Sequence, residues 1–307
     1  MNAAAANDLT SAVVNHSGVI QARSLVERDG RIILLGDMEH GTTNVSGSLD
    51  ASAVGETDGG FIETSAATVN ITDAIQVTTH SDLGQTGEWL VDPTDYSIAA
   101  AGGDITGATL SANLGTTNVT LQSDDGGSGT DGDIFVNDSI TWASGNTLTL
   151  TAFRNVEVNQ TITATGAGNL VLRAGNAANG IGTVNFNGAG AIDLNTGRGD
   201  IYYNVANYAT PTSYAANFGA GDTFAAWMLI NDVNDLQNIN DNLTTTGIYA
   251  LADDIDASAT STWNGGLGFL PIADNATFGS TFFEGQFDGQ SHNISNLVVN
   301  RPAADYQ

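Results

Sequence analysis

The sequence predicts an all-β fold built from many short strands that follow one another closely. Apolar side chains recur at every second position over segments of about four to six residues, which is typical of strands with one buried face. Clusters of Gly, Asn, Asp and Ser separate these segments, and the chain contains 37 Gly but only 4 Pro. Tight turns therefore connect the strands.

Ten segments carry the alternating pattern most clearly. In each of them, the apolar side chains are expected to face a core and the intervening polar side chains to face solvent. These segments are Val45–Leu49, Phe61–Val69, Val119–Gln122, Ile134–Val136, Leu148–Thr151, Val156–Val158, Leu170–Arg173, Val184–Phe186, Ile192–Leu194 and Ile201–Tyr203.

Two architectures combine many short strands with frequent turns, a β-sandwich or barrel and a β-solenoid. Small residues in the turns along the whole chain favour the solenoid, as does the absence of a module boundary about every 100 residues. Asn and Thr also recur beside the apolar positions, where stacked coils can align them into ladders. Coils of about 20–25 residues would give roughly 12 to 15 coils and a rod roughly 60–70 Å long. The residue pattern alone leaves the sandwich open.

One segment departs from the strand pattern and predicts a short α-helix near residues 231–242. Asn231 is the expected N-cap, and acidic residues follow it in the first turn. We place a boundary here, with a β-helix over 1–222 and a helix-bearing β section over 223–307 that continues the solenoid. The apolar residues that lie three or four apart are Val233, Leu236, Ile239 and Leu243.

The charge of the chain excludes several classes of partner. The seven basic residues are all Arg, against 34 acidic residues, and the formal net charge is -27. Nucleic acids and anionic lipids both attract proteins through Lys and Arg, so we expect no nucleic-acid partner. No apolar run is long enough to cross a bilayer, so we expect no membrane insertion. The chain has no Cys, which excludes disulfides and zinc–thiolate sites.

Several stretches resemble a known family. Similarity to coils of filamentous-haemagglutinin-like, two-partner secreted exoproteins is found in Val19–Arg23, Asp29–Gly36, Val45–Ser52 and Gly59–Glu63. Trp89–Tyr96 looks like a linker motif of the same proteins, and Gly285–Leu297 resembles the GLUG-type repeats found downstream in them. The resemblance covers nearly the whole chain in the family's order.

The resemblance implies a right-handed parallel β-helix from a large bacterial surface adhesin. Such a protein is secreted through an outer-membrane barrel transporter of the two-partner type. It acts at the cell surface in adhesion or aggregation, with host-cell or matrix glycans or proteins as partners. The family's amino-terminal secretion motifs are not found in this sequence, so we expect this chain to be an interior piece of such a rod, and not an enzyme.

Carboxylates in two places suggest calcium, which prefers oxygen ligands. The stretch Gly126–Asp131 partly matches a calcium-binding nonapeptide repeat. That match is a single copy, and Asp133 falls where the repeat needs an apolar residue, so solvated turns are the favoured interpretation. Calcium is accordingly a possible cofactor, and no other is expected. The candidate ligands are Asp131, Asp133, Asp253, Asp254 and Asp256.

Aromatic residues suggest sugar contacts, because sugars stack on aromatic rings. Trp263 and Asn264 lie in the most loop-like aromatic segment and are the candidate glycan-binding residues. We expect the other tryptophans to fill the core. A carbohydrate-active β-helix enzyme, using paired carboxylates, and a calcium-dependent glycan-binding module are the alternatives. No catalytic residue is assigned, since the four His are scattered and the acidic pairs are numerous.

Overall fold

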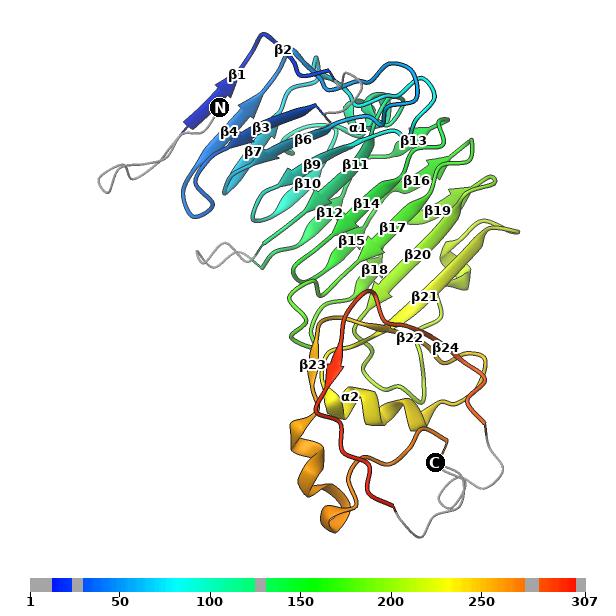
Figure 1. Cartoon of the computed structure of the whole chain (residues 1–307). Coiled ribbons are helices and arrows are strands. Elements are labelled where there is room, and N and C mark those ends of the chain that lie inside the picture. The colour runs from blue at the N-terminus through cyan, green and yellow to red at the C-terminus, as the bar shows by residue number, and fades with distance from the viewer. Residues whose placement is uncertain (1–12, 24–29, 125–130, 274–281, 302–307) are drawn as a thin grey trace.

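Parallel strand pairing dominates the fold. The computed structural model describes residues 13–23, 30–124, 131–273 and 282–301, and over these residues the chain winds into an elongated parallel β-helix (Figure 1). All pairings between the named strands of the described residues are parallel. The predicted all-β parallel β-helix is therefore confirmed.

One long sheet runs along the rod and forms one side of the coils. Neighbouring strands in it belong to successive coils, so the sheet grows by one strand per coil. Its ten strands are β3 (Arg31–Leu35), β6 (Phe61–Ser65), β9 (Glu88–Asp92), β11 (Asn118–Gln122), β14 (Leu148–Thr151), β17 (Leu170–Arg173), β20 (Arg198–Tyr203), β21 (Thr223–Ile230), β22 (Ile248–Leu251) and β24 (Gln286–Asp288).

Shorter sheets form the remaining sides of the coils. One side carries β1 (Val13–His16), β4 (Thr42–Val45) and β7 (Thr68–Ile71), then β10 (Tyr96–Ile98), β12 (Ile134–Val136), β15 (Val156–Val158) and β18 (Val184–Phe186). The next carries β2 (Val19–Gln21), β5 (Ser48–Asp50) and β8 (Gln76–Thr78), then β13 (Ile140–Trp142), β16 (Thr161–Ala164) and β19 (Ala191–Leu194). Near the C-terminal end β23 (Ile255–Asp256) pairs with β25 (Ile294–Ser295).

The coils are longer and fewer than the sequence suggested. Residues that face each other in neighbouring coils are 21 apart for Met228 and Tyr249, but 38 apart for Ile248 and Gln286. Ten strands stacked about 4.8 Å apart make the long sheet roughly 43 Å in length. The predicted 12 to 15 coils and 60–70 Å were wrong because turns and short helices lengthen many coils.

Columns of apolar residues fill the interior of the coils. Val119, Leu148 and Leu170 occupy one column of the long sheet, and each is completely buried. Outward-facing neighbours alternate with them, which is the period-2 pattern that the sequence displays. Burying each large aliphatic side chain stabilises the fold by about 1.5–3 kcal/mol, so every coil gains stability from the previous one.

Hydrogen-bonded asparagine ladders run along the outside of the rod, as expected from the recurrence of Asn. Asn44 donates to Asn15 and Asn70 donates to Asn44, both at 2.8 Å. A second ladder begins where Asn159 donates to Asn137 at 2.7 Å. The ladder prediction is confirmed, because parallel coils place equivalent side chains one above another.

Two of the predicted strands were too long, because each contains a corner. Val45–Leu49 spans the turn at Ser46 and Gly47 between β4 and β5. Gly47 has φ +80, and a Cβ atom there would lie 2.2 Å from the Gly18 carbonyl oxygen, so only glycine fits. Phe61–Val69 spans the corner between β6 and β7.

Two α-helices interrupt the strands of the described residues. The sequence did not predict α1 (Gly107–Asn113), which lies between β8 and β13 and takes the place of a strand. The Asn113 side-chain oxygen accepts from Val77 N at 2.7 Å, replacing a strand partner. The predicted helix is present as α2 (Val233–Asn238), continued by the 3₁₀ turn η2 (Ile239–Asp241).

The N-cap of α2 corrects the prediction by one residue. Asp232, not Asn231, has the extended backbone of an N-cap, and its carboxylate accepts from Asn234 N at 2.7 Å and Asp235 N at 2.9 Å. Asn231 directly follows β21, and Asp235 accepts from its backbone N at 3.0 Å. Two further 3₁₀ segments are η1 (Ala215–Asn217) and η3 (Ser258–Gly266).

Three tryptophans are buried, but only two of them fill the interior of the coils. Trp89 and Trp142 are 0% and 3% exposed and belong to the main core, as expected. Trp227 is 9% exposed and packs in a separate apolar cluster with Leu229, where it stacks on Tyr202, so the core prediction was wrong for this residue. At the C-terminal end, Phe287 in β24 and Ile294 in β25 are 42% and 37% exposed, although their partners in the preceding coil are buried.

Within the described residues, no helix has the length and apolarity that a membrane crossing requires.

Candidate functional site

A cleft of about 410 Å³ lies in the C-terminal section and brings α2 together with the end of η3. It contains both predicted glycan-binding residues, together with a polar face of α2 that the sequence analysis did not single out. Its volume falls in the range of small-molecule sites. The residues that line it are Asn234, Gln237, Asn238, Trp263, Asn264 and Leu270.

A left-handed turn positions Trp263. The backbone of Trp263 is extended, and Asn264 and Gly265 then adopt φ +53 and +69. Asn and Gly are the residues that occupy this region most readily. The Asn264 amide donates to the Gly268 carbonyl at 2.8 Å and closes the turn. The sequence Trp-Asn-Gly-Gly therefore fixes the indole at the rim of the cleft.

Trp263 is only partly buried. Its ring stacks against Phe269 with the two centroids 6.4 Å apart and the planes 21° apart, and Phe269 itself is 4% exposed. The indole N–H makes no hydrogen bond to any residue of the described part of the chain. Trp263 therefore offers the cleft an anchored aromatic surface and a free donor.

The helix side of the cleft combines a fixed amide with a free one. Gln237 donates to the Leu270 carbonyl and accepts from Leu270 N, both at 2.8 Å, which clamps the loop to α2. Asn238 is exposed, and its amide has no hydrogen-bond partner among the residues that the structure covers. Asn234 is partly engaged, with a 3.2 Å bond to Asp232.

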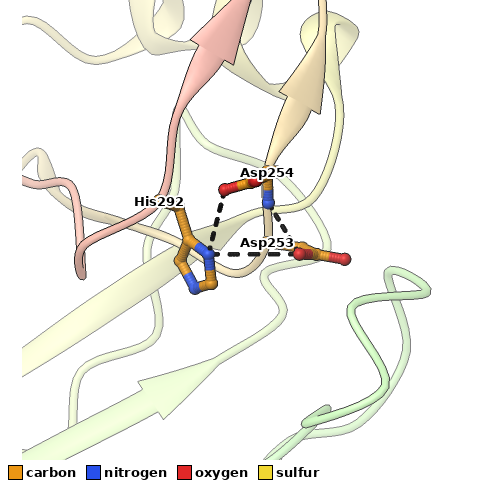
Figure 2. Close-up of side chains that lie close together, drawn as sticks. All are labelled: Asp253, Asp254 and His292. Carbon is orange, nitrogen blue, oxygen red and sulfur yellow. Dashed lines mark hydrogen bonds and ion pairs between the residues drawn. The ribbon is translucent and has the colours of Figure 1, made fainter.

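Asp253, Asp254 and His292 form an acidic cluster near β23 and β25. Figure 2 shows their side chains converging, with His292 Nδ1 3.4 Å from Asp254 Oδ1 and 4.0 Å from Asp253 Oδ1. The pairing of β23 with β25 brings these distant residues together. Hydrogen bonds from Asn293 N and from His292 hold the pKa of Asp254 below its usual value.

The cluster offers three potential metal ligands whose ligand atoms lie within 4.8 Å of one another. The two carboxylates are well exposed, and one of the three ligands is an imidazole nitrogen. Calcium prefers six or more oxygen ligands, whereas imidazole suits transition metals. The cluster thus has the donors for a divalent cation but lacks the oxygen cage that calcium prefers.

Asp256 does not join this cluster. Its carboxylate accepts from Ser258 N and from the Asn296 side chain, both at 3.0 Å, so it ties the start of η3 to β25. The hydrogen bond from Asn296 is the main reason that the pKa of Asp256 is lowered. The position of Asp256 therefore indicates a structural role.

The other predicted calcium ligands surround an arginine. Arg154 donates to Asp133 at 2.9 and 2.6 Å and lies 2.8 Å from Asp131. The hydrogen bonds to Asp133 are the main reason that the pKa of Arg154 is raised. A single guanidinium is thus already ion-paired with both carboxylates. The rest of the nonapeptide match, residues 126–130, lies outside the described residues.

An apolar groove of about 380 Å³ lies at the C-terminal end of the rod. It is lined entirely by apolar side chains, so it offers a polar ligand no side-chain hydrogen bond. Its lining residues are Leu236, Ile239, Phe269, Ile272, Phe283, Phe287, Ile294 and Leu297. The cleft at Trp263 differs from this groove by joining an aromatic ring to several amides.

Comparison with known proteins gives one partial similarity. A stretch of 79 residues, 25% of the chain, is 53% identical to Halomucin of Haloquadratum walsbyi, and it spans 1% of that protein's length. No family model matches the chain, and no solved structure matches it. The comparisons therefore leave the resemblance to filamentous-haemagglutinin-like exoproteins untested.

Proposed function

We propose that this chain is a rod-forming segment of a large extracellular surface protein, with a role in reach and display rather than catalysis. The observation that carries this proposal is the long sheet, which runs through ten strands along the described chain. Such a rod holds its ends at a fixed separation, because each coil packs on the previous one. The similarity to a short part of a very long protein fits a segment of this kind.

The acidic charge of the chain fits a role outside the cell, where dissolved salt controls the repulsion between copies of the rod. A net charge of -27 makes neighbouring copies repel one another and keeps a rod hydrated. Salt screens this repulsion over a distance of about 10 Å at 0.1 M and about 3 Å at 1 M. Association between copies of the rod should therefore rise with ionic strength.

Immunogold electron microscopy of the source cells tests the proposal. Antibodies against this chain should label the outside of the cell envelope, and the purified chain should compete with cells for attachment to a surface. Label confined to the cell interior would contradict an extracellular rod. Unchanged attachment at saturating amounts of the chain would reject adhesion and leave spacing as the role.

The route to the surface is a separate proposal. The motif resemblance and the parallel β-helix both fit two-partner export, in which stacking of coils outside the cell draws the chain forward. We expect a gene for an outer-membrane barrel transporter beside the gene for this protein. Deletion of that transporter should leave the protein inside the cell, whereas unchanged export would refute the route.

A further inference from the structure

We propose that the cleft between α2 and η3 binds a neutral sugar unit of a carbohydrate chain. This goes beyond the rod function, since it assigns a ligand to one place on the rod. It rests on the aromatic and amide side chains that meet there, on their fixed geometry, and on the sign of the charges around them.

The aromatic surface is the first element. One side of a pyranose ring is rich in C–H groups and packs well against an indole face. Trp263 lines the cleft and is anchored by stacking on the buried Phe269. A rigid aromatic side chain offers contact area with little loss of conformational freedom on binding. The other three tryptophans are buried and have no such surface.

Hydrogen-bonding groups around the aromatic ring are the second element. Sugar hydroxyls both donate and accept, so they pair well with amides, which also do both. The Asn238 amide and the Trp263 N–H have no partners within the described residues. The Asn264 oxygen is also available, because only its amide nitrogen is engaged in the turn.

The walls of the cleft are fixed in advance, which lowers the cost of binding. Gln237 clamps the Leu270 backbone through two hydrogen bonds of 2.8 Å, and the Asn264 amide locks the Trp263 turn. These hydrogen bonds hold Gln237 and the Trp263 turn in place before a ligand binds. Little ordering of these two parts of the cleft is therefore needed when a sugar binds.

The surrounding charges select neutral sugars over acidic ones. The lining residues carry no charge, while Asp232, the N-cap of α2, is hydrogen-bonded to Asn234 of the lining, and Asp235 lies in the first turn of α2. Arg301 donates to the Phe269 carbonyl at 3.3 Å, and its single positive charge does not offset the net charge of the chain. A uronic or sialic acid carboxylate would meet net repulsion here, and none of the residues that line the cleft is a cation that could pair with it.

A glycan array of neutral, uronic-acid and sialylated oligosaccharides, probed with the full chain, tests the proposal. We expect binding among the neutral glycans. In a titration with the strongest of them, Trp263→Ala should weaken binding by about tenfold or more, and Asn238→Ala by about threefold to tenfold. Phe282→Ala is the matched control, since Phe282 is an exposed aromatic of the same section that does not line the cleft.

The outcomes separate the sugar site from the rod. Asn238 has no partner in the described fold, so its variant should keep the wild-type circular dichroism and melting temperature. Loss of binding in this folded variant supports the site. Equal binding by Asn238→Ala, Trp263→Ala and wild type, binding of acidic glycans only, or no glycan binding at all would overturn the site. Each of these results would leave the rod function standing.

Discussion

Removal of Arg154 should destabilise the rod far more than removal of a surface arginine. Asp133 is 5% exposed, and its carboxylate faces the Arg154 guanidinium through two hydrogen bonds of 2.9 and 2.6 Å. Arg154→Ala leaves that carboxylate buried and without a cation, a change that costs about 3–5 kcal/mol. We expect the lower end, about 3 kcal/mol, because the Asn155 N–H still donates to Asp133 at 2.8 Å and Arg154 is one-third exposed.

Arg198→Ala provides a matched control. Arg198 also makes two hydrogen bonds of 2.8 Å to one carboxylate, that of Asp200, but its side chain is 47% exposed. Its loss should cost about 1 kcal/mol or less. Urea unfolding followed by circular dichroism measures both variants. Equal losses of unfolding free energy would refute the reasoning that burial makes the Arg154 pair important.

Three further predictions follow from local features. Burial raises the pKa of Asp92 from 3.8 to about 6. Between these two values the folded protein keeps the proton that the unfolded chain has lost, so the free energy of unfolding falls as the pH rises through this range. Asp92→Asn should therefore stabilise the protein by about 1–2 kcal/mol at pH 7, after allowance for screening, and by much less at pH 4; an equal gain from exposed Asp82→Asn would point to net charge instead. Asn44→Ala removes two ladder hydrogen bonds and should lower the unfolding free energy by about 1 kcal/mol. A loss near zero would show that the ladder does not contribute to stability. About 1 mM Ca²⁺ should shift the melting temperature no more than a salt of matched ionic strength, and a larger shift that disappears in Asp254→Asn would establish a calcium site.

The sequence predicts individual strands, but it does not predict which residues of neighbouring coils pair with each other. Alternating residues such as Val119 and Leu121 identify a strand locally, and their burial is confirmed. The pairing of Arg154 with Asp133 joins residues 21 apart, one coil along the rod. Because coil length varies from 21 to 39 residues, no fixed spacing identifies such partners in advance.

In the candidate site too, the sequence predicted local features but not contacts between residues that lie far apart in the chain. Trp263 and Asn264 were identifiable because a Trp-Asn-Gly-Gly turn is a local signal. His292 was not linked to Asp253 and Asp254, since only the pairing of β23 with β25 brings it near them. The polar face of α2 was missed as well, because the apolar spacing that predicts a helix says nothing about what its other face meets.

Distances between spin labels test the parallel β-helix most directly. The chain contains no Cys, so pairs of cysteines can be labelled without background. Glu63, Thr120, Thr149 and Val171 face outward from the long sheet on β6, β11, β14 and β17. From Glu63, the backbone separations to the other three should rise in even steps, roughly 10, 14 and 19 Å, regardless of the unequal chain lengths between them. Distances that fail to increase in this order, as in a sandwich whose strands alternate between two sheets, would contradict the account.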